Sequence, residues 1–129
     1  MPKQALSPSG LPAPSGPYSQ GVKSGRLVFV AGQVSVDANG KTVGAGDIRA
    51  QTRQALKNVE AVLAAAGAAF DDILKVTIFL TDVGQIGGVQ EVRPEFFREP
   101  YPASTLVEVS RLVSPEWLIE IEAVALVGG

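Results

Sequence analysis

One amphipathic helix, placed between segments rich in β-forming residues, constrains the fold of this chain more than any other sequence feature. Asp47 is a good helix N-cap, because its carboxylate can accept a hydrogen bond from a free backbone amide of the first turn. Gly67 is the expected end of the helix, since glycine readily adopts the left-handed backbone that stops many helices. Between them, apolar residues form one stripe at helical spacing: Ile48, Ala55, Leu56, Val59, Val62, Leu63 and Ala66. Such a stripe has to pack against another layer of the protein.

Strands predicted on both sides of the helix would form that layer. Ile73–Leu80 has the composition of a buried strand. Leu118–Leu126 alternates, so that Ile119 and Ile121 face one side while Glu120 and Glu122 face the other. Further strands are predicted at Gln20–Lys23, Arg26–Ala31, Val34–Val36 and Ser104–Val109, with turns at Ser24-Gly25 and Asn39-Gly40.

A second, weaker helix is expected after Thr81-Asp82. Ile86, Val89 and Phe96 have helical spacing, but the segment also contains two glycines and Pro94. Proline cannot donate a backbone hydrogen bond, so the helix should kink or restart at Pro94.

The order of these elements indicates an α+β fold in one domain, residues 1–129, with a mainly antiparallel sheet and two helices on one face. Five of the nine prolines fall in the first seventeen residues, so residues 1–16 are expected to form an extended arm. The longest nearly apolar run, Ala61–Phe70, is shorter than the roughly 20 residues of a membrane helix. No membrane association is expected. Because no secretory signal is visible, we expect a cytoplasmic protein.

The absence of cysteine and histidine limits the chemistry of the chain. With neither residue present, it can build no disulfide, Cys/His zinc site or Ser-His-Asp triad. Any acid–base chemistry must use carboxylates, lysine, tyrosine or water. The net charge of −2 argues against nucleic acid as a partner, and no nucleotide or metal motif is present.

The remaining candidates for chemistry are scattered. Glu120 and Glu122 share one strand face, and either they orient water in a cleft or they are solvated surface glutamates. Tyr18 either donates a hydrogen bond to a substrate or anchors the end of the arm by packing. Ser104 has no histidine base, so hydrogen bonding at the strand entrance is a simpler role than nucleophilic attack.

Blocks of sequence along nearly the whole chain carry a family resemblance. They are Gly16–Gly21, Val30–Gln33, Gln51–Val59, Ala66-Gly67, Lys75–Asp82, Tyr101–Ala103, Val107–Val109 and Ile119–Ala123. In their order and spacing they resemble the RidA/YjgF family of reactive-intermediate deaminases, formerly called L-PSP endoribonucleases.

The resemblance implies a chorismate-mutase-like α+β fold and a homotrimer whose ligand clefts lie between subunits. It also implies hydrolysis of reactive imines and enamines, such as 2-aminoacrylate, to a keto acid and ammonia without a cofactor. By the same resemblance, Glu120 positions water, and Tyr18, Ala31 and Gly32 line the cleft.

The chain departs from the family pattern at three expected substrate-binding positions. Ser104 stands where the family has an arginine that holds the substrate carboxylate, Leu106 replaces a frequent cysteine, and Gln90 replaces an asparagine. Loss of the arginine removes a bidentate, charge-assisted contact. This places the chain with the arginine-lacking branches of the family.

Two functions therefore stay open. In the first, the protein is a hydrolase for an imine, enamine or related metabolite, a 2-keto or imino acid for example, with a substrate that is larger or less anionic. Arg93, one helical turn from Gln90, could then replace the missing arginine, although a solvated helix residue is the simpler interpretation. In the second, the protein is a non-catalytic trimer that binds a small molecule or a partner.

Overall fold

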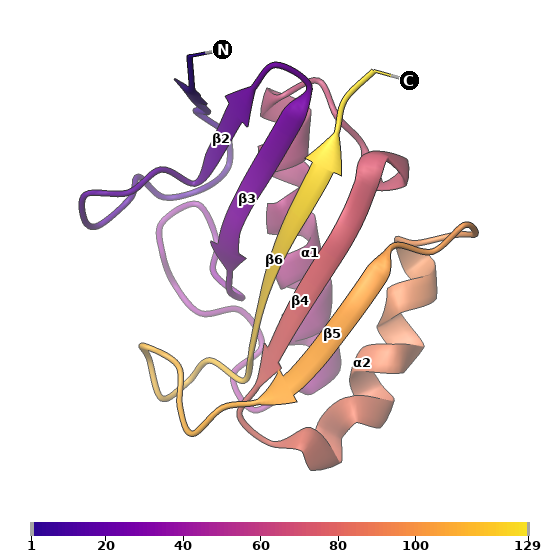
Figure 1. The fold of residues 1–129 in the computed structure, drawn as a ribbon. Helices are drawn as coiled ribbons and strands as arrows, with labels where there is room; N and C mark the ends of the chain where they lie inside the picture. Colours follow the sequence, from indigo (N-terminus) through magenta and orange to yellow (C-terminus); the bar gives the residue numbers. More distant parts are fainter. Residues whose placement is uncertain (1, 129) are drawn as a thin grey trace.

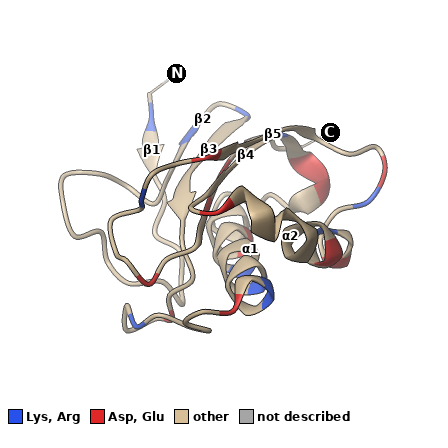
Figure 2. Ribbon diagram, turned by 90° about the horizontal axis from the view of Figure 1, so that it is seen from below, with Lys and Arg blue, Asp and Glu red and all other residues tan. Residues whose placement is uncertain are grey.

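A single six-stranded sheet with both helices on one of its faces makes up the fold (Figures 1 and 2). The structure is a computed structural model, which describes residues 2–128. In spatial order, the strands are β1 (Gln4–Ala5), β2 (Gly21–Ser24), β3 (Leu27–Gln33), β6 (Ile119–Leu126), β4 (Ile73–Leu80) and β5 (Ala103–Glu108). β4 and β5 are parallel and all other neighbours are antiparallel, which confirms the predicted mixed, mainly antiparallel sheet.

Helix α1 (Ile48–Ala65) forms as its sequence predicts. The Asp47 side chain accepts a hydrogen bond from the Ala50 amide at 3.1 Å, which satisfies one free amide of the first turn. Gly67 follows the C-terminus with a φ of 76°, a conformation that costs other residues energy. The apolar stripe is buried against the sheet and forms the centre of the core.

Helix α2 (Ile86–Val92) packs beside α1 (Figure 2), and it ends just before Pro94, where the sequence predicts an interruption. A short 3-10 turn, Val83–Gln85, leads into α2, and a second one, Arg93–Glu95, replaces the helix at the proline. The restart places Arg93 at the end of α2. A third 3-10 turn, Phe70–Asp72, precedes β4.

The strand predicted at Val34–Val36 is wrong. This segment makes only one isolated bridge, between Val36 and Thr42. The buried side chain of Asn58 explains the difference, because its Nδ2 donates to the carbonyls of Val34 and Val36 at 2.9 and 3.0 Å. These carbonyls are thus satisfied by α1 and need no strand partner.

Part of the N-terminal arm packs on the domain. Gln4 and Ala5 pair with β2, and Leu6 is buried in the core at 7% exposure. Within residues 2–128, no helix is both long and apolar enough to cross a bilayer.

Candidate functional site

Glu120 lies on the face of the sheet that the helices leave open. Its neighbours Ile119 and Ile121 point into the core, so the alternation of β6 places Glu120 and Glu122 on the opposite side. Partial burial raises the pKa of the Glu120 carboxyl, and the nearby charge of Glu122 raises it further. Glu120 therefore holds a proton more readily than an ordinary surface glutamate.

Gly32 makes room for the Glu120 side chain. A Cβ atom at position 32 would lie 2.3 Å from Glu120 Oε2 and 2.7 Å from its carboxyl carbon, both closer than atoms can approach. The register of β3 against β6 shifts between Val30 and Gln33, which brings Gly32 against the glutamate. Glycine at this position is thus explained by the carboxylate that lies across it.

Tyr18 and Ala31 belong to the same end of β3. The Ala31 amide donates to the Gln20 carbonyl at 2.9 Å, and Gln33 Nε2 donates to Gln20 Oε1 at 2.9 Å. Tyr18 lies just before β2 in the chain. Because β2 runs antiparallel to β3, Tyr18 is at the end of β3 that carries Gly32. The Tyr18 side chain is 52% exposed. We call Tyr18, Ala31, Gly32 and Glu120 the Glu120 group.

Gln90, Ser104 and Leu106 lie on the other face of the sheet, beside α2. Ser104 pairs in register with Val76 and Leu106 with Ile78, and both partners point into the core. Ser104 and Leu106 therefore face the helices, and Leu106 packs against the core. Together with Arg93, they form what we call the Arg93 group: Gln90, Arg93, Ser104 and Leu106.

Arg93 is not the solvated helix residue that the simpler interpretation of the sequence favours. Its side chain is partly buried, and Nη2 donates a hydrogen bond to Ser104 Oγ at 3.0 Å. Nη1 donates to Gln90 Oε1 at 3.3 Å, and the guanidinium carbon lies 5.8 Å from the centre of the Phe97 ring. A guanidinium thus reaches Ser104, and it comes from the 3-10 turn that follows α2.

The Arg93 group borders a cavity of about 290 Å³, which we call the Arg93 cavity. It is lined by Gln90, Arg93, Pro94, Phe97, Tyr101, Pro102 and Ser104. Its polar atoms thus come mainly from three residues, whereas prolines and aromatic rings form the rest of the wall. This composition is typical of a site for a small molecule with one polar end.

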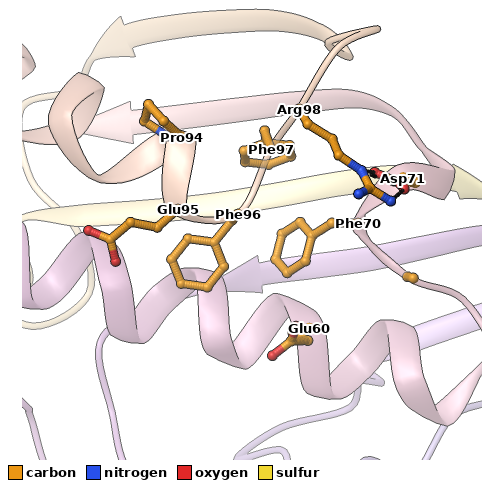
Figure 3. Close-up of a pocket in the computed structure, with 9 residues that line it drawn as sticks. Glu60, Phe70, Asp71, Pro94, Glu95, Phe96, Phe97 and Arg98 are labelled. Carbon is orange, nitrogen blue, oxygen red and sulfur yellow. Dashed lines mark hydrogen bonds and ion pairs between the residues drawn. The ribbon is translucent and has the colours of Figure 1, made fainter.

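A larger cavity of about 450 Å³ lies on the other side of Phe97 (Figure 3), and we call it the Phe70 cavity. Phe70 packs there against Phe96 and Phe97, with ring centres 5.4 and 5.1 Å apart. The arginine at its edge, Arg98, forms an ion pair with Asp71. This cavity therefore holds no cation that lacks a counter-ion.

The two groups of predicted site residues lie on opposite faces of the sheet in one chain. Glu120 pairs with Phe79 on the open face, whereas Ser104 pairs with Val76 on the helix-covered face. A site that uses both groups consequently needs a second copy of the chain. Among residues 2–128, no cluster of three or more acidic side chains is arranged to hold a metal ion.

Comparison with known proteins gives consistent results. The endoribonuclease L-PSP family model matches residues 9–127. A RutC family protein of Pyrococcus horikoshii is 45% identical over 123 residues, which cover 95% of this chain and 97% of the relative. The 2-iminobutanoate/2-iminopropanoate deaminase of Salmonella typhimurium is 40% identical over 126 residues, which cover 95% and 97%. The structure of E. coli TdcF with bound serine superimposes with a TM-score of 0.88, at 36% identity and 97% and 99% coverage.

Proposed function

The chain belongs to the endoribonuclease L-PSP family, the RidA/YjgF family, and on that premise we propose that it hydrolyses small imines or enamines to carbonyl compounds and ammonia. Relatives named 2-iminobutanoate/2-iminopropanoate deaminase and 3-aminoacrylate deaminase support this class of reaction. The observation that carries the proposal is the setting of Glu120, a partly buried carboxylate fitted against Gly32.

Glu120 would act on water. As the water oxygen bonds to the imine carbon, the carboxylate accepts one of the water protons and passes it to the imine nitrogen, which becomes the amine of a carbinolamine. Glu120 then accepts the proton of the carbinolamine hydroxyl and passes it to the same nitrogen as the carbon–nitrogen bond breaks, so that ammonia leaves while the carbonyl forms. Water supplies the oxygen and both hydrogens, and nothing is oxidised or reduced. The raised pKa of Glu120 suits a group that takes up and returns a proton.

Tyr18, Ala31 and Gly32 would form the wall of the cleft next to Glu120. The Tyr18 side chain is half exposed and its phenol is available as a hydrogen-bond donor to the substrate nitrogen or leaving group. The backbone at Ala31 and Gly32 is held by the Gln20 contacts, which makes it a rigid surface against which a planar imine can lie.

A homotrimer would bring the Glu120 group of one copy to the Arg93 group of the next. Leu27, Phe29 and Val107 are 43%, 51% and 40% exposed on the open face of the sheet, and a trimer interface on this face would cover them. Light scattering coupled to size exclusion should give three times the chain mass of 13.4 kDa. A monomer at micromolar concentration would contradict a cleft shared between copies.

The test compares Glu120→Gln with Glu122→Gln. Glutamine keeps the shape of the side chain but cannot accept the proton, so Glu120→Gln should lower keto-acid release from freshly generated 2-iminobutanoate by about 100-fold or more. Glu122→Gln is the matched control on the same strand face and should have a much smaller effect. Equal effects would argue for a structural role of the pair, and saturable binding without any turnover by the wild type would favour a non-catalytic binding protein.

A further inference from the structure

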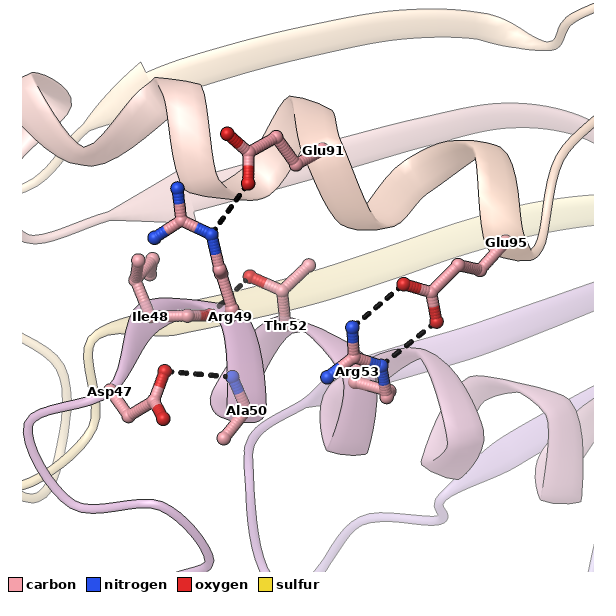
Figure 4. A network of polar contacts seen from close by, with 8 residues as sticks. All are labelled: Asp47, Ile48, Arg49, Ala50, Thr52, Arg53, Glu91 and Glu95. Atoms are coloured by element: carbon pink, nitrogen blue, oxygen red, sulfur yellow. Dashed lines mark hydrogen bonds and ion pairs between the residues drawn. The ribbon is translucent and has the colours of Figure 1, made fainter.

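Arg93 differs from Arg49, Arg53 and Arg98 in having no carboxylate partner. Arg49 pairs with Glu91 at 2.6 Å and Arg53 pairs with Glu95 at 2.7 Å, as Figure 4 shows. Arg98 pairs with Asp71 (Figure 3). Within residues 2–128, no acidic side chain lies at ion-pair distance from Arg93.

The contacts that Arg93 does make leave its charge unbalanced. Gln90 Oε1 and Ser104 Oγ are neutral acceptors, and together they use two of the five N–H groups of a guanidinium. Burial lowers the pKa of Arg93, yet an arginine stays protonated at any physiological pH. A partly desolvated cation without a counter-ion costs free energy, and an anion in the cavity would remove that cost.

The cavity around Arg93 indicates which anion fits. A single guanidinium matches the charge and the planar fork of one carboxylate. A dianionic phosphate usually needs more positive charge or several backbone amides, and the lining residues supply one cation. Pro94, Phe97 and Pro102 form an apolar wall suited to a hydrocarbon side chain.

We infer that Arg93, held by Ser104 and Gln90, binds the carboxylate of a small monocarboxylic acid whose apolar side chain lies against Pro94, Phe97 and Pro102. If the protein hydrolyses imines as proposed above, this inference identifies its substrate as a 2-imino acid with a side chain larger than methyl. The volume of about 290 Å³ exceeds what 2-iminopropanoate would fill.

Binding of unreactive probes tests the inference without catalysis. Isothermal titration of the wild type with 4-methyl-2-oxopentanoate and with its primary amide compares a carboxylate with a neutral group of the same shape. We expect the carboxylate to bind at least about 10-fold more tightly, and also more tightly than pyruvate. Equal affinity for acid and amide would overturn the inference.

Variants then locate the interaction. Arg93→Gln should weaken carboxylate binding by about 10- to 150-fold and abolish the preference over the amide. Ser104→Ala, which removes one acceptor that orients the guanidinium, should weaken it by about 2- to 10-fold. Arg98→Gln, at the Phe70 cavity, is the matched control and should bind like the wild type. Circular dichroism verifies the fold of each variant, and Arg93→Lys, which keeps the charge but loses the fork, should bind with an intermediate affinity.

The outcomes also separate this inference from the proposed function. If Arg93→Gln keeps the carboxylate preference while imine hydrolysis proceeds normally, the inference is wrong and the proposed function stands. If carboxylate binding depends on Arg93 but no imine is hydrolysed, the inference stands and the proposed function is wrong.

Discussion

The Phe70 cavity and the Arg93 cavity share Phe97 and Pro94 as walls, but only the arginine at the Phe70 cavity has a carboxylate partner. At the Phe70 cavity, the guanidinium of Arg98 is neutralised by the chain itself through Asp71. At the Arg93 cavity, the guanidinium has only neutral acceptors from the chain. The larger of the two is therefore the weaker candidate for an anion site.

The difference shows that the counter-ion of a cation is a better guide to a binding site than the size of the cavity. An anion entering the Phe70 cavity would have to compete with Asp71 for Arg98, and it would gain little because the pair is exposed to water. An anion entering the Arg93 cavity competes with no carboxylate and meets a cation that is already partly desolvated.

Removing the shared wall should give the largest effect on stability. Phe97 is 7% exposed and packs edge to face on Phe70, so Phe97→Ala should lower the free energy of unfolding by about 3–5 kcal/mol. Phe96→Ala is the control, because Phe96 is only partly buried and should cost less. Urea unfolding measures both. If the two variants lose equal stability, Phe97 is not the wall that separates two distinct cavities.

Moving the guanidinium from position 93, just after α2, to position 104 on β5 should sharpen the comparison between the two cavities. In the double variant with Arg93→Ser and Ser104→Arg, carboxylate affinity should lie within about 10-fold of the wild type, whereas Arg93→Ser alone should lose about 10- to 150-fold. Ser104→Arg alone replaces the hydroxyl that accepts from Arg93 at 3.0 Å with a second cation, so it should not improve binding and should cost about 1–3 kcal/mol of stability. Titration with 4-methyl-2-oxopentanoate measures all three. A double variant no better than Arg93→Ser would contradict the view that an unbalanced guanidinium in this cavity is sufficient.

Periodicity in the sequence predicts the helices and strands in which buried and exposed side chains alternate regularly. The stripe of α1 and the alternation of β6 specify which side of each element faces the core, and Pro94 specifies where α2 ends. Val34–Val36 was mispredicted because it has strand-like composition, but its carbonyls bind Asn58. That contact joins residues more than 20 positions apart and leaves no periodic signal.

In the candidate site, too, only the part that follows from regular alternation could be predicted from the sequence. Alternation along β6 predicts that Glu120 and Glu122 share the open face, and the structure confirms it. The contact between Arg93 and Ser104 depends on how α2 packs beside β5, so spacing alone could not establish it. The available signal was Pro94, which ends the helix at Val92 and places Arg93 in a turn.

The smallest expected effect concerns pH and the ion pair at the Phe70 cavity. Arg98 lowers the pKa of Asp71, so the pair contributes stability above the unfolded pKa of about 3.9, and this contribution is lost as the pH falls through the lower folded value. Asp71→Asn has no such contribution to lose, so between pH 5 and pH 2 its urea midpoint should fall slightly less than that of the wild type. The difference should be small, because both side chains are exposed, and 1 M salt should reduce it.

Arg93→Gln should follow the wild-type profile over this range, since Arg93 pairs with no titrating carboxylate. If the low-salt profiles of Asp71→Asn and the wild type coincide, Asp71 does not neutralise Arg98 in solution, and the contrast between the two cavities disappears.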